Sequence, residues 1–447
     1  MSQSLSAPLR QAERISIIDT LRGLALLGIL MMNIPYFSAP EVQSYNLNVL
    51  NEYSGPNFYT WMVVNVTFEG TMRAIFSMLF GAGCLLLLDR LAKTPEVDAA
   101  NIYHRRLLWL FLFGMINAYI LLWPGDILYS YAVCGLFLYP FKKMKAGHLL
   151  IISFVLMLAM MTKGTYQIWK QKNIREKGEA ALVVEKNKAK LTPAQTDAKE
   201  AWLRLQERNK PESLLREAEK ERAGIRQDYF SVLGYLSGIN AMLQSKKFYH
   251  WSFLDNMIAI FLGMALFRWG VLTAKRSKKF YWLMMLGGYG LGLPLSYYEH
   301  STLVAIRFDY TRVLDLFFVE FYEPRRLLVA FGHAGLILLL YKYGFFKQLY
   351  RGFARVGQMA FSNYLMQTLI CGTIFYGYGF ALYGKLERYE TYYVVGAVWI
   401  FQFIFSNIWL RYFRFGPFEW IWRSLTYWKK QPMKKKKPLP EPAPALA

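Results

Sequence analysis

Apolar stretches of about twenty residues recur along this chain, and each is long enough to cross the ~30 Å hydrocarbon core of a bilayer as a helix. Most of the loops between them alternate between rich and poor in Lys and Arg. Basic residues concentrate in the cytoplasmic loops of membrane proteins. The pattern therefore predicts an all-α, polytopic integral membrane helical bundle.

Ten transmembrane helices are expected, and their approximate ranges are 15–35, 71–89, 106–123, 126–141, 147–166, 252–272, 280–298, 326–345, 358–382 and 392–411. A further apolar stretch, 58–68, is too short to span alone and predicts a re-entrant or interfacial piece. Counting it gives eleven membrane segments.

The loop charges predict the orientation. Arg10 and Arg14 precede the first span, the 35–70 loop has no Lys or Arg, and the chain ends after Lys434–Lys437. Both termini are therefore expected in the cytoplasm. The 299–326 loop is an exception, because it carries arginines and carboxylates on the predicted outer side and so resembles a folded element.

Four regions follow from these patterns. Residues 1–166 form an N-terminal membrane half, 167–250 a charged helical linker outside the cytoplasm, 251–428 a C-terminal membrane half, and 429–447 a basic, proline-rich disordered tail. Within the linker, Thr192-Pro193-Ala194-Gln195 has the residues of a helix start with a capping box. A second charged helix is expected from Pro211 to Arg226, which gives an exposed hairpin.

The formal net charge of +23 does not indicate a nucleic-acid partner, because the excess lies largely beside the spans, where it orients helices in the bilayer. The three cysteines lie far apart in apolar segments, without CxxC spacing. They predict neither a disulfide framework nor a metal site. No bound cofactor is expected.

Polar residues inside spans are costly and are the first candidates for function. One group lies near the predicted inner face. Its members are Asp19, Arg22, Asn363, Tyr364, Gln367, Arg411, Arg414, Glu419 and Arg423. Arginines bind phosphate oxygens bidentately, so the group predicts an anion pocket. The alternative is that these side chains pair with each other or reach lipid headgroups.

A second group lies near the predicted outer face. Glu69 and Arg73 stand four residues apart, Asp126 opens a span, and His333 lies within another. Histidine is the usual general base near neutral pH, so His333, Glu69 and Asp126 are the catalytic candidates. The structural alternatives are that Asp126 is a helix N-cap and that His333 bonds neighbouring helices.

Several motifs resemble those of the bacterial YeiB-like membrane proteins. They are Asp19-x-x-Arg22-Gly23, Phe76–Gly83, Gly125-Asp126-Ile127-Leu128, Gly357–Leu365 and Phe415–Tyr427. The last string is the most specific, and the resemblance covers most of the chain except 167–250. It implies a multi-pass protein of the bacterial inner membrane, similar to the transmembrane acyltransferase group.

The resemblance implies transfer of an acyl group from cytoplasmic acyl-CoA to a sugar-like or lipid-linked acceptor on the other side. No histidine matches a catalytic motif, so His333 is chosen by position alone. Two alternatives stay open: a transporter or flippase for an anionic or lipid-linked solute, and a non-catalytic scaffold. The sequence also leaves open whether the chain forms a homodimer.

Overall fold

The computed structural model describes residues 16–93 and 98–435, and within them every regular element is a helix apart from one isolated bridge between Phe413 and Lys434. Arg10 and Arg14 lie outside the described residues. So do Lys436, Lys437 and the proline-rich end of the tail.

The N-terminal part contains α1 (Ser16–Ser38), α2 (Glu41–Tyr45), α3 (Gly55–Phe68), α4 (Thr71–Leu91), α5 (Ala99–Tyr119), α6 (Leu128–Leu136) and α7 (Ala146–Lys186). The linker contains α8 (Pro193–Asn209), α9 (Pro211–Ile225) and α10 (Tyr229–Met242). The C-terminal part contains α11 (Phe253–Arg268), α12 (Lys278–Ala305), α13 (Val313–Leu316), α14 (Tyr322–Tyr343), α15 (Lys347–Gln358), α16 (Ala360–Phe375), α17 (Thr391–Tyr412) and α18 (Pro417–Tyr427).

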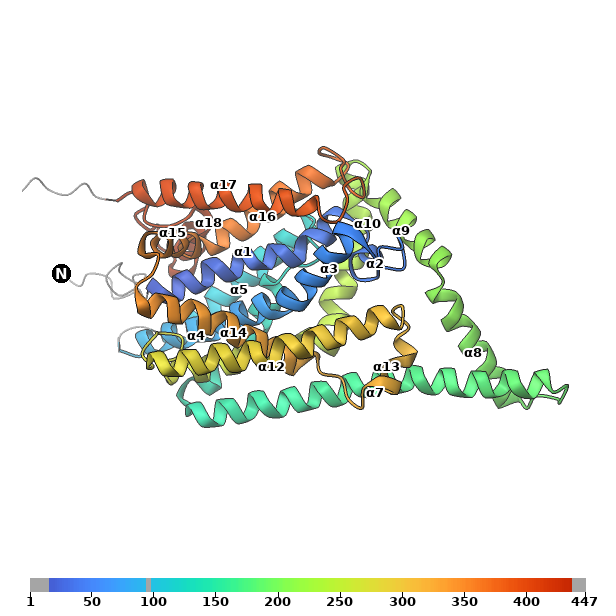
Figure 1. Ribbon diagram of the computed structural model, residues 1–447. Helices are drawn as coiled ribbons and strands as arrows, with labels where there is room; N and C mark the ends of the chain where they lie inside the picture. Colours follow the sequence, from blue (N-terminus) through green and yellow to red (C-terminus); the bar gives the residue numbers. More distant parts are fainter. Residues whose placement is uncertain (1–15, 94–97, 436–447) are drawn as a thin grey trace, which may run out of the picture.

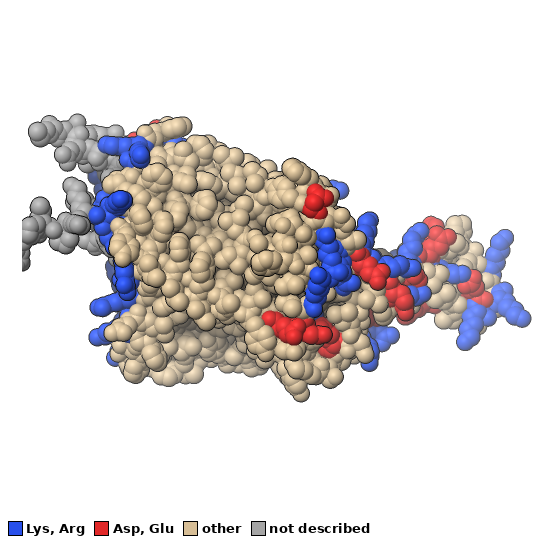
Figure 2. Space-filling view, turned by 90° about the horizontal axis from the view of Figure 1, so that it is seen from above, with Lys and Arg blue, Asp and Glu red and all other residues tan. Residues whose placement is uncertain are grey.

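The long helices form one bundle, in which α1 begins and α17 ends on the same side (Figure 1). Lys and Arg gather at that end, and a broad uncharged belt follows it (Figure 2). We call this the basic end, and the opposite end, from which α8 and α9 project, the hairpin end. Charged ends on either side of an apolar belt are what a bilayer-spanning bundle requires.

Six helical segments are long and apolar enough to cross a membrane, and they are Ser16–Ser38, Gly55–Leu91, Ala146–Lys186, Tyr229–Arg268, Tyr322–Tyr343 and Thr391–Tyr412. The protein is therefore an all-α membrane bundle, as predicted. Helices also occupy the other four expected spans, as α5, α6, α12 and α16. The total of ten crossings stays a prediction.

The two charged linker helices form as the sequence predicts, but they do not fold back on each other: α8 packs on the end of α7, and α9 continues from α8 toward the bundle (Figure 1). Thr192 Oγ1 accepts the N–H of Gln195, and the Gln195 side chain accepts the N–H of Thr192, which completes the capping box at the start of α8. The second helix, α9, ends at Ile225. Helix α7 is 41 residues long, about 60 Å at 1.5 Å per residue, and so it carries α8 beyond one bilayer. Helix α9 returns to the bundle, where Leu214 and Ala218 pack on Val42 and Val49.

Two boundaries differ from the sequence prediction. Helix α10 begins at Tyr229 and continues through a π-helical stretch, Leu243–Ser252, into α11, so this membrane segment starts more than twenty residues before 252. The polar run Gln244–Lys247 lowers the mean hydropathy of this stretch, so the sequence did not predict the first part of the segment. The tail predicted to be disordered from 429 is ordered to Lys435, whose N–H donates to Tyr412 O.

The short apolar stretch near 58–68 becomes α3, which continues into α4 after a break at Glu69 and Gly70. Gly70 has φ +71°, a backbone conformation that favours glycine. The break frees carbonyls at the end of α3: Val66 O accepts Ser296 Oγ, and Thr67 O accepts His333 Nε2. Interrupted membrane helices are tolerated where neighbours bond the freed backbone groups, as here.

Glycines bring several helices close together, as the Gly81-Ala82-Gly83 and Gly287-Gly288-Tyr289-Gly290 strings predict. A Cβ on Gly288 would lie 2.4 Å from Gly332 N, and one on Gly81 would lie 2.4 Å from Ile260 O. Small residues permit such close backbone approach between membrane helices. Gly83 differs, because a Cβ there would meet nothing within 4 Å.

Candidate functional site

The basic end contains a cavity of about 230 Å³ between α1, α4, α5, α6, α16 and α18. Its walls are mostly apolar, and we call it the basic-end cavity. The charged residues in its lining are Asp19, Arg22, Arg90, Arg106, Glu419 and Arg423. On α4 the lining extends from Arg90 to Phe76, fourteen residues or about 21 Å at 1.5 Å per residue. The cavity is therefore deep, apolar and basic.

The Asp19–Arg22 pair predicted from spacing is present, with 2.8 Å between Arg22 Nη1 and Asp19 Oδ1. The Arg106 guanidinium lies 3.7 Å from the centroid of the Trp422 ring, on α18. Four guanidiniums and two carboxylates thus line one cavity, which leaves an excess of positive charge. Such a site suits an anion that also carries an apolar part.

The structure divides the predicted inner group. Arg411 and Arg414 are exposed and do not line the cavity, so they do not join Arg22 and Arg423 as the sequence suggested. Asn363 and Gln367 are buried elsewhere: Asn363 Nδ2 donates to Ser406 Oγ, and Gln367 Nε2 donates to Gln402 Oε1. These two residues bond α16 to α17, and only Tyr364 of that helix turn lines the cavity.

Glu419 is a cap as well as a lining residue. Its carboxylate accepts the backbone N–H groups of Phe361 and Ser362 at 2.7 and 3.0 Å, and also the Ser362 hydroxyl. Burial raises the pKa of this carboxyl, and the hydrogen bonds from Ser362 oppose that rise. A Cβ on Gly416 would lie 2.1 Å from Glu419 Oε2, so this glycine leaves room for the cap. The contact joins the two most specific C-terminal motifs.

The deep end of the basic-end cavity is aromatic. The Tyr131 ring stacks on Phe80 and Phe76, with centroids 4.9 and 6.0 Å apart, and its hydroxyl lies 2.9 Å from Ser77 Oγ. Arg73 precedes Ser77 by one helical turn, and it lines a second cavity. Along α4, the two cavities are thus separated by about one turn, or ~5.4 Å.

The second cavity, of about 430 Å³, lies toward the hairpin end between α4, α7, α11, α12 and α14, and we call it the hairpin-end cavity. Its charged lining residues are Arg73, Lys247, Asp255, Glu299, Glu320 and Glu323. Aromatic walls come from Trp251, Tyr310, Phe317, Phe321 and Tyr322. Carboxylates outnumber cations here, the reverse of the basic-end cavity.

A buried ion network forms one wall of this cavity. Arg73 Nη1 lies 2.9 Å from Asp255 Oδ2, and Arg73 Nη2 donates to the Tyr322 hydroxyl at 3.0 Å. Arg326 binds both Asp255 and Glu323, with 2.7 Å between its Nη2 and Glu323 Oε2. Arg326 is 1% exposed, so its removal would leave two carboxylates buried without this cation.

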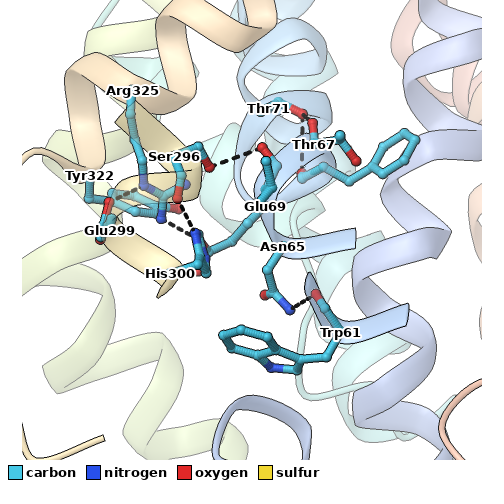
Figure 3. Close-up of polar contacts among 12 residues, drawn as sticks. Trp61, Asn65, Thr67, Glu69, Thr71, Ser296, Glu299, His300, Tyr322 and Arg325 are labelled. Carbon is cyan, nitrogen blue, oxygen red and sulfur yellow. Dashed lines mark hydrogen bonds and ion pairs between the residues drawn. The ribbon is translucent and has the colours of Figure 1, made fainter. Parts of the chain in front are cut away.

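Glu69 belongs to an adjoining network at the break between α3 and α4 (Figure 3). Arg325 bridges Glu69 and Glu299, and His300 Nε2 lies 3.2 Å from Glu69 Oε2. The other His300 nitrogen lies 2.7 Å from Ser296 O. Both ring nitrogens of His300 therefore face acceptor oxygens. The expected neighbours Glu69 and Arg73 therefore serve two different ion networks.

His333 has partners at both ring nitrogens. Nε2 lies 2.8 Å from Thr67 O, and Nδ1 lies 2.9 Å from the Tyr289 hydroxyl. A carbonyl only accepts, so Nε2 carries the proton, and Nδ1 of the neutral ring accepts from Tyr289. His333 lines neither cavity. The geometry fits an interhelical bond at the α3 break, and a catalytic role stays a prediction.

Asp126 is placed between α5 and α6. Its carboxylate accepts the Tyr129 backbone N–H and the Asn117 amide, each at 2.8 Å. These are the contacts of a side chain that caps the start of α6 and fastens it to α5. It lines neither cavity, and its predicted catalytic role is also untested.

Four residues of the hairpin-end ion network and cavity are not among the candidates predicted from sequence: Asp255, Glu320, Glu323 and Arg326. Asp255 lies inside an expected span, so intramembrane charge was a signal that could have found it. The other three belong to the 299–326 stretch, which was recognised only as an anomalous outer loop. Its excess of charge was the available signal.

The fold and its two cavities define a polytopic helical membrane protein with one basic and one carboxylate-rich interior site. Residues 266–429 match the family described as "Protein of unknown function (DUF418)". The chain is 30% identical to the uncharacterized protein YxaH of Bacillus subtilis, over 95% of this chain and 97% of the relative. It is 29% identical to the uncharacterized protein YeiB of Escherichia coli, over 93% and 96%.

A third relative is the uncharacterized 39.9 kDa protein in the amylase 3′ region of Bacillus acidopullulyticus, 27% identical over 96% of this chain and 99% of the relative. No solved structure matches the chain. The protein belongs to the YeiB-like family of membrane proteins of unknown function.

Proposed function

We propose that the protein transfers an acyl group across the bacterial inner membrane, from acyl-CoA at the basic end to an acceptor at the hairpin end. One observation carries the proposal: two cavities of opposite charge approach within about one turn of α4. From the positive-inside rule we expect the basic end, and with it both termini, to lie in the cytoplasm, where acyl-CoA is made.

The basic-end cavity supplies what an acyl-CoA needs. Arg22, Arg90, Arg106 and Arg423 offer guanidiniums to phosphates. The apolar walls below them accept the chain that carries the thioester. At the deep end the Tyr131 hydroxyl is available to donate to the carbonyl oxygen as negative charge develops on it.

The acceptor enters the hairpin-end cavity, and a carboxylate there takes its proton. Glu320 suits this role better than the three residues chosen from sequence, because it lines the cavity and lies outside the ion pairs. Burial raises its pKa to about 7, with Glu299 and Glu323 adding to the rise. A group with a pKa near the working pH is an effective general base. His333, Glu69 and Asp126 remain the alternatives.

The test is to incubate purified protein with radiolabelled acetyl-CoA and candidate acceptors, and to measure CoA release and label transfer. We expect both, and loss of both in Tyr131→Phe/Glu320→Gln. A matched control is Glu221→Gln, which changes a half-buried carboxylate on α9 that lines neither cavity. Absence of CoA release with every acyl donor tried would reject the enzyme proposal.

A transporter or flippase is the second candidate, and the break between α3 and α4 favours it. Transporters bind solutes at interrupted helices near the middle of the membrane. Here the break is occupied by Glu69, His300 and Arg325 (Figure 3). Uptake of an anionic lipid into vesicles by purified protein, without any covalent change, would favour this candidate.

A further inference from the structure

Two carboxylates of the hairpin-end cavity have unused binding capacity. No ion pair in the described chain joins Glu320 to a cation, and its Oε1 accepts only the Tyr322 backbone N–H, at 2.7 Å. Glu323 is 1% exposed, and its Oε1 has no hydrogen-bond partner among the described residues. Both residues line the same cavity. A buried, unsatisfied carboxylate oxygen is costly unless a ligand bonds to it.

The charges around the cavity give the sign of the ligand. Four carboxylates line it, Asp255, Glu299, Glu320 and Glu323, against two cations, Arg73 and Lys247. Arg73, Arg325 and Arg326 pair with three of the four carboxylates. The Lys247 side chain is 54% exposed and lies 3.9 Å from Glu41. Glu320 is the carboxylate left without a cation.

The walls indicate which kind of cation fits. Phe317, Phe321 and Tyr322 line the cavity beside the two carboxylates. Aromatic faces attract organic ammonium groups, through the ring quadrupole and through contact with their carbon atoms. An ammonium also donates to each carboxylate in a charge-assisted hydrogen bond.

We infer that the hairpin-end cavity recognises an acceptor through an ammonium group held between Glu320 and Glu323. This rests on the proposed function, because it names the chemical class of the acceptor. In the transfer step Glu320 takes one proton from the ammonium. The nitrogen lone pair forms the C–N bond to the thioester carbonyl, the C–S bond breaks, and the leaving thiolate takes a second proton from nitrogen. The products are an amide and free CoA.

The experiment uses ethanolamine, with ethylene glycol as a neutral probe of similar size, on the full-length protein in detergent without acyl-CoA. Thermal unfolding is followed as each probe is titrated. We expect saturable stabilisation by ethanolamine in the millimolar range and none by ethylene glycol. Glu320→Gln and Glu323→Gln should each raise the apparent Kd at least tenfold. The control Glu221→Gln should leave it unchanged.

Equal effects of the two probes, or wild-type ethanolamine affinity in both cavity variants, would overturn the inference. The CoA-release assay separates it from the proposed function. If the protein cleaves acetyl-CoA but does not bind ethanolamine, only the ammonium site is rejected. Ethanolamine binding without any acyl transfer would retain the site and reject the enzyme.

Discussion

The basic-end cavity presents four guanidiniums on mostly apolar walls, whereas the hairpin-end cavity surrounds its single lining guanidinium with four carboxylates. In the first cavity positive charge is in excess. In the second, most of the charge is paired within the protein, through Arg73, Arg325 and Arg326. The comparison teaches that intramembrane charge is left in excess at one end and is largely paired at the other, where Glu320 is outside the ion pairs of the described residues.

The largest expected effect comes from removing the cation at the centre of the buried ion network. Arg326→Leu would leave Asp255 and Glu323 buried without their shared cation, which costs about 3–5 kcal/mol. We expect little folded protein, measured by the monodisperse peak in size-exclusion chromatography. Adding Glu323→Gln should recover part of the yield, because one uncompensated charge is then gone.

The matched control is Arg312→Leu, since the Arg312 side chain is 60% exposed and pairs only with nearby Asp309. It should fold as wild type, because exposed pairs contribute little. If Arg326→Leu folds equally well, the network is not structural, and the contrast between the two cavities fails.

Features that depend on residues close together in the chain could be predicted from the sequence, whereas contacts between distant residues could not. The helix class, the two charged linker helices and the Asp19–Arg22 pair follow from local spacing, and all three are confirmed. The predicted hairpin between the two linker helices is wrong, because α8 packs on α7. The hairpin-end cavity requires contacts between α4, α11 and α14, and the basic-end cavity requires contacts between α1, α5 and α18, which no local pattern specifies. Arg73 was expected beside Glu69 because they are four residues apart, yet Arg73 pairs with Asp255, which is remote in sequence. Arg411 and Arg414 are close in sequence to Glu419, which lines the basic-end cavity, but they are exposed and do not line it. Proximity in sequence does not decide which way a side chain points.

A second prediction concerns His333, which lines neither cavity. If His333 serves only as an interhelical hydrogen-bonding residue, His333→Gln should keep most of the free energy of unfolding, because an amide also donates and accepts hydrogen bonds. His333→Ala should cost about 1–2 kcal/mol, the range of hydrogen bonds between membrane helices. Thermal unfolding of both variants checks this order. If His333 is instead a general base, both variants should lose 10²–10⁴-fold in the rate of acyl transfer. That outcome would move the chemistry away from the two cavities.

A third prediction sharpens the recognition side. Gly83 lines the basic-end cavity and has open space around its Cβ position, so Gly83→Leu should fill the cavity without disturbing the packing. We expect at least tenfold weaker binding of palmitoyl-CoA, measured by equilibrium dialysis, with unchanged thermal unfolding. The control is Gly287→Leu, an exposed glycine on α12 that also has open space. Equal affinity in the two variants would show that the ligand does not enter this cavity.

A fourth prediction tests which end faces the cytoplasm. Cys84, Cys134 and Cys371 are buried, so we expect the wild-type chain to react little with a maleimide. Ala194→Cys, exposed on α8, should react with an impermeant maleimide in intact spheroplasts. Gln348→Cys, exposed on α15 at the basic end, should react only after the membrane is opened. The reverse pattern would exchange the donor and acceptor sides of the proposal.

The smallest effect comes from the one cavity carboxylate without a cation. Burial raises the pKa of Glu320 from an ordinary 4.5 to about 7 in the folded protein. A carboxyl whose folded pKa is raised binds its proton more tightly when folded, so its contribution to stability is complete below about pH 4.5 and is lost as pH rises through 7. Wild-type protein should therefore unfold at a higher temperature at pH 5.5 than at pH 8. Glu320→Gln cannot ionise, so that part of the difference should disappear, while Glu221→Gln keeps it. An ammonium ligand reverses the preference by stabilising the charged carboxylate, so saturating ethanolamine should reduce the same pH difference in the wild type. Identical pH profiles for wild type and Glu320→Gln would mean that Glu320 is solvated, and the two cavities would then differ in their ion pairs alone.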